Sequence, residues 1–152
     1  MKDKIRIASG QGFWGDLLTA PVDQVTKGPI DYMMMDYLAE VTMSILQKQK
    51  RKEPSLGYAR DLVPLMEQIL PTIVQRNIKV ITNGGGVNPA ACAEAILAAA
   101  MKLGIKTLKI GVVLGDDILD HIDDLSAKEI ELKNMETDEP VSNVRPDRKS
   151  VV

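Results

Sequence analysis

The sequence has few aromatic residues and no excess of positive charge. Aromatic residues make up 3% of the 152 residues, which leaves few rings on which nucleic-acid bases could stack. The 19 Lys and Arg residues are balanced by 21 Asp and Glu residues. No expected helix carries a basic stripe that could neutralise a row of phosphates. These features argue against nucleic acid as a partner.

Cysteine and long apolar segments are also scarce. The single Cys92 cannot form an internal disulfide. The N-terminus, MKDKIRIAS, lacks the apolar core of about 7 to 15 residues that a signal peptide contains. The longest apolar run, AILAAAMKLG, is interrupted by Lys102 and falls short of the roughly 20 residues that cross a bilayer. We therefore expect a cytoplasmic protein without a membrane span.

Histidine chemistry has little support in the composition. His121 is the single histidine and has no neighbouring cysteine, so neither a zinc site nor a Ser-His-Asp triad is expected. Cys92 is expected in the first turn of a helix, where a thiol pKa can be lowered. Among so many alanines, however, packing explains Cys92 better than a role as nucleophile.

Apolar patterning predicts strands that alternate with helices. Strands are expected at residues 5–9, 30–36, 77–82 and 106–113, and helices at about 19–27, 38–51, 59–76 and 89–103, with a short helix through His121. Pro64 and Pro71 predict a kink in the third helix or its division into two pieces. The alternation implies βαβ crossovers and a mostly parallel sheet. The expected fold class is α/β, with three layers, about four strands and a Rossmann-like arrangement.

The C-terminal residues differ in character from the rest. The 45% apolar content of the chain is enough to fill one core, and we expect one domain over residues 1–130. Residues 131–152 are polar, contain two prolines and show no periodicity, so they are predicted to be loop or disordered.

Four polar segments follow the expected strands. They are SGQGFWGD, DYLAE, TNGGGVNP and LGDD. Because parallel strands run in one direction, these segments gather at the carboxyl edge of the sheet, where ligands bind in the crevice at which strand order reverses. We expect the functional site at this edge.

The first segment has the spacing G-x-G-x-x-G, formed by Gly10, Gly12 and Gly15. A dinucleotide fingerprint also needs a helix that opens directly at the third glycine and an acidic residue about 20 positions on. Asp31 and Asp36 are suitably spaced, but FWGDLLTAP delays the expected helix. This mismatch weakens the dinucleotide interpretation.

Two other interpretations fit the first glycine loop. The glycines could serve tight turns alone, because glycine adopts positive φ without steric cost. Alternatively, residues 10–16, ending at Asp16, could form a backbone nest for a carboxylate or phosphate, with Phe13 and Trp14 as its walls. The nest is the preferred interpretation.

The second glycine loop gives a more specific signal. Three consecutive glycines, Gly84, Gly85 and Gly86, lie between a buried strand and a helix, as expected where backbone N–H groups approach a ligand closely. Asn83 could bond a ligand oxygen directly. For Asn88 a helix cap is a sufficient explanation, with ligand binding as the alternative.

Acidic residues complete the expected site. Asp36 and Glu40 lie four residues apart where a strand passes into a helix, and Asp116 follows the expected fourth strand. Together they could supply acid/base catalysis or bind Mg²⁺. The alternative for Asp36, Asp116 and the adjacent Asp117 is that they are ordinary acidic residues at helix N-termini. For Asp117 that alternative is favoured.

Several of these blocks resemble one known family. SGQGFWGD, DYMMMDYLAEVTMSIL, GYARD, IKVITNGGGVNPAACAEAI and GDD occur in the order seen in the acyclic terpene utilisation (AtuA-like) family, over roughly residues 5–150. The resemblance implies a role in the breakdown of acyclic terpenes such as citronellol and geraniol through acyl-CoA and branched-acid intermediates. Family members are longer, which implies that this chain is a truncated N-terminal portion. The resemblance provides no catalytic residues.

The sequence thus leads to one preferred function and two alternatives. The preferred one is the N-terminal part of a cytoplasmic catabolic enzyme for a small anionic substrate, a carboxylate or acyl-CoA. Residues 10–16 and 83–88 would hold anionic oxygens, and Asp36, Glu40 and Asp116 would supply the chemistry. The alternatives are a nucleotide- or NAD-binding domain and a non-catalytic assembly module or inactive fragment. The cofactor is left open among a CoA thioester, a nucleotide and Mg²⁺, and the expected partner is a second copy or the missing C-terminal region.

Overall fold

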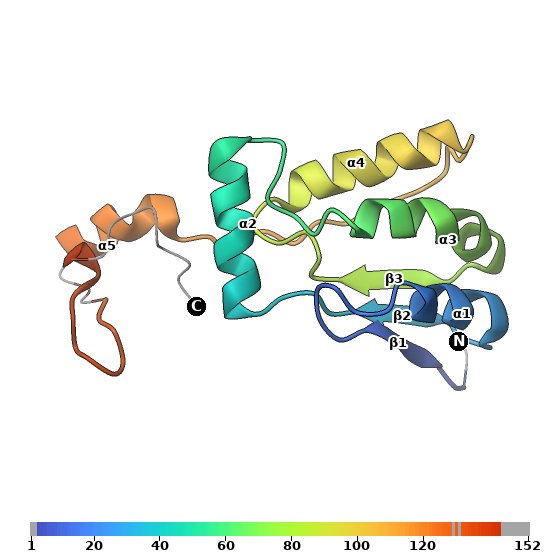
Figure 1. Ribbon diagram of the computed structural model, residues 1–152, viewed down its shortest axis with the longest axis horizontal. Helices are drawn as coiled ribbons and strands as arrows, with labels where there is room; N and C mark the ends of the chain where they lie inside the picture. The colour runs from blue at the N-terminus through green and yellow to red at the C-terminus, as the bar shows by residue number, and fades with distance from the viewer. Residues whose placement is uncertain (1–2, 129, 131, 144–152) are drawn as a thin grey trace. The chain divides into compact units, whose positions relative to one another are not determined.

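The computed structural model describes residues 3–128, 130 and 132–143. The chain forms two compact units, Met1–Val112 and Val113–Val152, and each is described by itself. In the described residues, the first unit contains three strands and four helices (Figure 1).

The strands of the first unit form one parallel sheet. They are β1 (Ile7–Gln11), β2 (Tyr32–Met35) and β3 (Lys79–Thr82), in the order β1-β2-β3. Ser9 pairs with Met34, and Met34 pairs with Ile81. The predicted α/β class and parallel pairing are confirmed. The strand order does not reverse in this sheet, so it lacks the crevice at a reversal point that the sequence led us to expect.

The helices match the sequence patterns closely. They are α1 (Thr19–Lys27), α2 (Glu40–Lys52), α3 (Leu62–Arg76) and α4 (Pro89–Lys102). The sequence predicted that the fourth helix ends at about residue 103, and Gly104 ends α4 there, because it adopts a φ of 75° and the Ile105 N–H donates to the Ala100 carbonyl at 2.9 Å. This is the Schellman arrangement, which favours glycine at that position.

The third helix continues through both of its prolines. Pro64 lies in the first turn of α3, where its missing N–H costs no helical hydrogen bond, and Pro71 lies inside the helix. The segment is therefore one helix rather than two pieces. Asn77 ends it in the left-handed conformation, with a φ of 53°.

One face of the sheet forms the core of the first unit. Met33 and Met35 of β2 are fully buried, as is Val25 of α1. They belong to one cluster with Leu65 and Ile69 of α3, and this cluster also includes residues of α4. Figure 1 shows α3 and α4 on the same side of the sheet. The buried side chains therefore hold these helices against a single face.

The other face of the sheet remains exposed within the first unit. Ile7, Met34 and Ile81 project from it, and Ile7 is 70% exposed. The three-layer, Rossmann-like arrangement is therefore not confirmed. The strand order explains this, because crossovers of one hand that advance in one direction place their helices on one face.

The expected fourth strand at residues 106–113 does not form. This segment has no strand pairing, although Leu108 and Ile110 pack against the core. Its apolar residues alternate as in a strand. This pattern indicates that one face of the segment is buried, but it does not show that the backbone pairs with a neighbouring strand.

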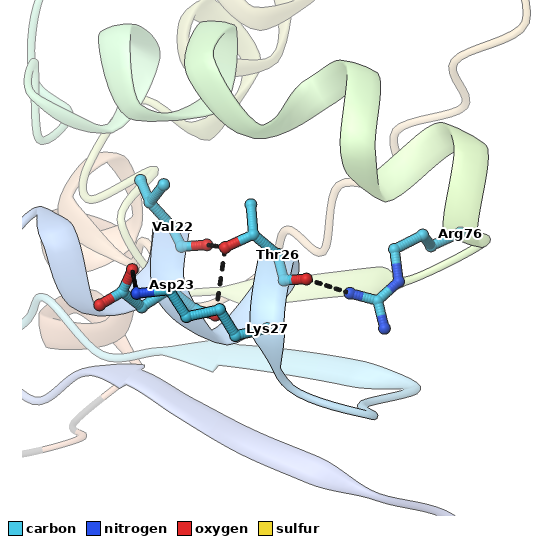
Figure 2. A network of polar contacts seen from close by, with 5 residues as sticks. All are labelled: Val22, Asp23, Thr26, Lys27 and Arg76. Atoms are coloured by element: carbon cyan, nitrogen blue, oxygen red, sulfur yellow. Dashed lines mark hydrogen bonds and ion pairs between the residues drawn. The ribbon is translucent and has the colours of Figure 1, made fainter.

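Arg76 joins two helices at the amino edge of the sheet (Figure 2). Its guanidinium, at the end of α3, donates to the carbonyls of Val25, Thr26 and Gly28 at the end of α1, with a distance of 2.8 Å to Gly28. These carbonyls have no partners within α1, so Arg76 satisfies them. The contact holds the C-terminal ends of α1 and α3 together at the amino edge of the sheet, opposite the carboxyl ends of the strands.

The second unit has little regular structure among its described residues. It contains two short 3₁₀ helices, Leu119–His121 and Val141–Asn143, and helix α5 (Ile122–Ala127). An isolated antiparallel bridge joins Lys133 to Pro140. Of the polar tail expected at 131–152, residues 131 and 144–152 lie outside the described part. None of the helices in residues 3–128, 130 and 132–143 combines the length and hydrophobicity that a bilayer crossing requires.

Candidate functional site

The ends of the three strands place polar residues along one edge. Gln11 is the last residue of β1, Asp36 directly follows β2 and Asn83 directly follows β3. The Asp36 N–H donates to the Gln11 carbonyl at 3.0 Å. Three of the four predicted segments therefore meet at the carboxyl edge, and the fourth, LGDD, belongs to the second unit.

Asp36 and Asn83 form a hydrogen-bonded pair at this edge. Asn83 Nδ2 donates to Asp36 Oδ1 at 2.6 Å, and Asn83 Oδ1 accepts the Tyr37 N–H at 2.8 Å. The amide of Asn83, followed by the backbone N–H of Leu38, lowers the pKa of Asp36. Asp36 is therefore an ionised acceptor held in a fixed orientation at neutral pH.

Trp14 and Asp61 form a second pair. Trp14 Nε1 donates to Asp61 Oδ1 at 2.5 Å, although the two residues are 47 positions apart. Asp61 is the N-cap residue of α3, yet its side chain makes no capping hydrogen bond. Sequence reasoning singled out Trp14 but missed Asp61, because the helix was expected to begin at about residue 59 and Asp61 would then lie inside it. The one available signal was that a buried indole N–H usually has a hydrogen-bond acceptor, which indicates a polar partner for Trp14 but does not identify it.

The phenol of Tyr37 is a third feature that the sequence did not reveal. Tyr37 is 0% exposed, and its hydroxyl has no hydrogen-bond partner among the described residues. Burial is the main cause of its raised pKa, with smaller effects of Asp61 and Cys92. The phenol is therefore protonated at neutral pH and can donate a hydrogen bond.

Cys92 belongs to the same buried cluster as Tyr37 but is not an activated thiol. Burial raises its pKa to about 11, and a thiol in that state is a poor nucleophile. The packing interpretation of Cys92 fits this environment.

Gln11 adds another buried polar atom. Its side chain is 2% exposed and donates through Nε2 to the Asp16 carbonyl at 3.3 Å. In the part of the chain that the structure describes, Oε1 of Gln11 has no partner. A buried acceptor without a donor calls for an explanation such as a water or a ligand.

The first glycine loop holds the carboxylate of one of its own residues, Asp16. The carboxylate of Asp16 accepts the N–H of Gly12 at 3.0 Å and that of Leu17 at 2.7 Å. These N–H groups lower the pKa of Asp16, with that of Gly12 having the larger effect. Asp16 thus occupies the place that the sequence suggested for a bound carboxylate.

The same loop does not meet the requirements of a dinucleotide fingerprint. Gly15 has a φ of 97°, and α1 begins only at Thr19. Gly10 is packed within β1, where an added Cβ would meet Met33 Sδ at 2.7 Å. Asp31 precedes β2 and accepts the Arg6 N–H at 2.9 Å, so it lies at the opposite edge of the sheet.

The glycines of the second loop are closely packed. An added Cβ on Gly84 would lie 2.9 Å from Leu62 Cδ2, and one on Gly85 would lie 2.8 Å from Pro89 Cβ. Gly86 has a φ of 54°, and its Cβ would meet the Gly57 carbonyl oxygen at 2.7 Å. These contacts account for all three glycines through packing.

The backbone N–H groups of the second loop are largely used within the protein. Gly84 N donates to Thr82 Oγ1, and Gly86 N donates to the Asn83 carbonyl, both at 3.0 Å. The Nδ2 of Asn88 donates to the carbonyls of Pro54 and Leu56, both at 2.8 Å, and caps no helix. Asn88 therefore anchors the loop before α3.

The remaining predicted acidic residues are not members of these hydrogen-bonded pairs. Glu40 is the exposed first residue of α2, where its charge complements the helix dipole. Asp116 is exposed in the second unit, and the neighbouring Asp117 accepts the Leu119 N–H at 3.0 Å through Oδ1. Catalytic roles for Glu40 and Asp116 stay predictions. Among the described residues, no group of three or more His, Cys, Asp or Glu side chains could hold a metal ion.

Apolar side chains are exposed beside the polar pairs. Phe13 is 59% exposed, and Leu17 and Leu18 in the same loop are also exposed. With Trp14 they form the apolar loop, residues 13–18, which follows β1 at the carboxyl edge. This edge therefore combines an apolar surface with hydrogen-bonding groups, as ligand sites commonly do.

Comparison with known proteins identifies the family. The family model described as "Acyclic terpene utilisation family protein AtuA" matches residues 5–151. Neither the curated proteins nor the solved structures provided a match. The match covers nearly the whole chain and includes every element of the carboxyl edge, so the chain belongs to the acyclic terpene utilisation (AtuA) family.

Proposed function

We propose that this chain is part of a catabolic enzyme that binds an oxygenated acyclic terpenoid at the carboxyl edge of its sheet. Family membership supports the terpenoid class. In this proposal the hydrocarbon chain of the ligand lies on the apolar loop, and its oxygenated end reaches the polar groups at the strand ends.

One observation carries the proposal. The structure has three buried side-chain oxygens without partners among its described residues, and two of them, Gln11 Oε1 and Tyr37 OH, belong to residues at this edge. The third belongs to Gln49 of α2. Such groups are rare in native proteins because each unmade hydrogen bond is costly. Because two of the three belong to residues at or just after the ends of β1 and β2, they support a binding site at this edge.

Asp36 and Asn83 suggest how the bound oxygen would be handled. Asp36 is an ionised carboxylate, and its hydrogen bond from Asn83 fixes its orientation. It could accept a proton from a ligand or a water molecule as a general base. We therefore assign Asp36 the catalytic role and Asn83 the role of positioning it.

The charge at this edge favours some substrates over others. Asp16, Asp36 and Asp61 all contribute carboxylates, and Asp16 already accepts the N–H groups of the first glycine loop. An acyl-CoA thioester, whose acyl end is neutral, suits this environment better than a free carboxylate. A dinucleotide is not favoured, because α1 does not open at the third glycine.

Ligand titration of the full chain tests the proposal. We expect isothermal titration calorimetry to detect citronellol or citronellyl-CoA but not NAD. Asp36→Asn should weaken binding about 10- to 100-fold, the scale of one hydrogen bond to a charged group. Asp23→Asn is the matched control, because Asp23 is exposed on α1 and pairs with Lys27. Absence of binding by both terpenoids, or equal affinity of the Asp36→Asn variant, would refute the proposed function.

A further inference from the structure

We infer that Tyr37, Asp61 and Trp14 form a subsite for an uncharged hydroxyl group of the ligand. This inference rests on the proposed function and specifies the chemistry of one part of that site. The subsite uses other side chains than the Asp36–Asn83 pair, although the Tyr37 N–H donates to Asn83. It needs a ligand group that can both accept and donate a hydrogen bond.

The hydroxyl of Tyr37 is the inner wall of the subsite. It is fully buried and has no partner in the described ranges. The ring packs closely against Gly84, since a Cβ added to that glycine would lie 3.0 Å from Tyr37 Cδ2. The hydroxyl therefore cannot swing out to water, and its partner must come to it.

Asp61 provides the acceptor of the subsite. It directly precedes Leu62 at the start of α3, and the side chains of Leu62 and Tyr37 meet beside Gly84, where an added Cβ would lie 2.9 Å from Leu62 Cδ2 and 3.0 Å from Tyr37 Cδ2. The charge of Asp61 also contributes to the raised pKa of Tyr37. Oδ1 of Asp61 accepts the indole N–H of Trp14. A carboxylate has about four lone-pair sites, so Asp61 retains capacity for a further donor.

These two groups specify the class of ligand atom. The Tyr37 phenol donates a hydrogen bond, and the Asp61 carboxylate accepts one. An alcohol hydroxyl satisfies both at once, accepting from Tyr37 and donating to Asp61. A ligand carboxylate would instead place a second negative charge beside Asp61. The subsite therefore favours an alcohol over the corresponding acid.

Trp14 and Phe13 make the subsite suitable for a hydrocarbon chain. The half-buried indole of Trp14 is joined to Asp61, and the exposed ring of Phe13 precedes it in the chain. A terpene alcohol with its hydroxyl at Asp61 would have apolar surface beside its first carbons. Water could fill the polar position but would leave the apolar surface unused.

The single tryptophan allows a direct test with the full chain. Trp14 is the only Trp in the sequence, so its fluorescence reports occupancy beside Asp61. We would titrate citronellol and citronellate into the wild type, Tyr37→Phe, Asp61→Asn and the control Tyr32→Phe, whose phenol lies on the exposed sheet face. Thermal melting of each variant would separate binding from folding.

The subsite predicts a specific set of affinities. Citronellol should bind the wild type at least 10-fold more tightly than citronellate. Tyr37→Phe should weaken citronellol about 10- to 100-fold without lowering the melting temperature, since it removes an unpartnered hydroxyl. Asp61→Asn keeps an oxygen for Trp14 and should reduce the preference for the alcohol over the acid. Tyr32→Phe should change neither affinity.

Other outcomes would overturn the inference in distinguishable ways. Equal binding of citronellol by the wild type and Tyr37→Phe would refute the subsite, and if that variant also melts lower, the phenol holds a water molecule. Equal affinity of the wild type for alcohol and acid would also refute it, while leaving the proposed function in place. Absence of binding by citronellol, citronellate and citronellyl-CoA would refute both.

Discussion

The two glycine-rich loops at the carboxyl edge look alike in sequence but differ in structure. The first loop is open at its two glycines beyond β1, because an added Cβ would meet no atom closer than 3.9 Å on Gly12 and none within 4 Å on Gly15. The second is tightly packed, since each of Gly84, Gly85 and Gly86 has a heavy atom within 3.0 Å of that position. A glycine cluster therefore has two physical origins, freedom of the backbone and close approach of neighbours.

The difference changes where a ligand can be sought. The packed loop uses most of its N–H groups internally and supports the site through Asn83. The open loop carries Trp14 and the exposed apolar side chains, and its Asp16 closes the turn. Ligand contacts are therefore expected from side chains next to the glycines more than from the glycine backbone.

The largest effect is expected in the packed loop. Gly86→Ala would place a methyl group against Leu46 Cδ1 and the Gly57 carbonyl, at a φ of 54°. Left-handed strain and overpacking together should lower the free energy of unfolding by about 2 to 5 kcal/mol. Urea denaturation of the purified variant measures this. A loss below about 1 kcal/mol would show that packing does not explain this glycine.

A smaller loss of stability is expected where Asn88 joins the packed loop to the loop before α3. Asn88→Ala removes two hydrogen bonds to the carbonyls of Pro54 and Leu56, which should lower the free energy of unfolding by about 1 to 3 kcal/mol. Gln68→Ala, on the exposed surface of α3, is a suitable control for urea denaturation. If Asn88→Ala matched that control, the contact would be irrelevant to stability.

In the open loop, glycine-to-alanine substitutions should change the free energy of unfolding only through backbone strain. Gly15→Ala introduces no clash but retains a φ of 97°, so a loss of about 1 to 2 kcal/mol is expected. Gly12→Ala should stay within about 0.5 kcal/mol, because the nearest atom to its Cβ is Asp16 Oδ2 at 3.9 Å. Equal losses for the two variants in urea would contradict this distinction.

The smallest expected effect concerns the pH dependence of the open loop. The N–H groups of Gly12 and Leu17 lower the pKa of Asp16 below its ordinary value of 3.8. Its stabilising effect is therefore complete above that value and lost as the pH falls through the lowered pKa. Asp16→Asn should show a flatter decline in stability below pH 3.8 than the wild type, measured by urea denaturation at several pH values. Parallel declines would contradict the role of the charge.

Local signals allowed much of the fold to be predicted. Helix α1 was predicted at the observed bounds, because Pro21 suits a first turn and Gly28 ends the helix. The end of α4 near Gly104 was predictable from an equally local signal. The uncovered sheet face and the missing fourth strand were not predictable in this way, since strand order and pairing depend on contacts distant in sequence.

Which polar residues share the carboxyl edge was predictable in part, but their hydrogen-bond partners were not. Strand direction alone placed Asp36 and Asn83 at one edge. Asp61 was missed because its partner Trp14 is 47 residues away, and Tyr37 was missed because a tyrosine in an apolar segment is usually packing. Asp116 was expected at the same edge because a fourth strand was assumed.

The measurement that tests the central claim most directly is an NMR titration of the full chain with citronellol. The account predicts that amide shifts concentrate in residues 12–18, at Asp36 and Tyr37, and at Asp61 and Asn83. Shifts centred on the exposed sheet face around Ile7, Met34 and Ile81, with the strand ends unaffected, would contradict it.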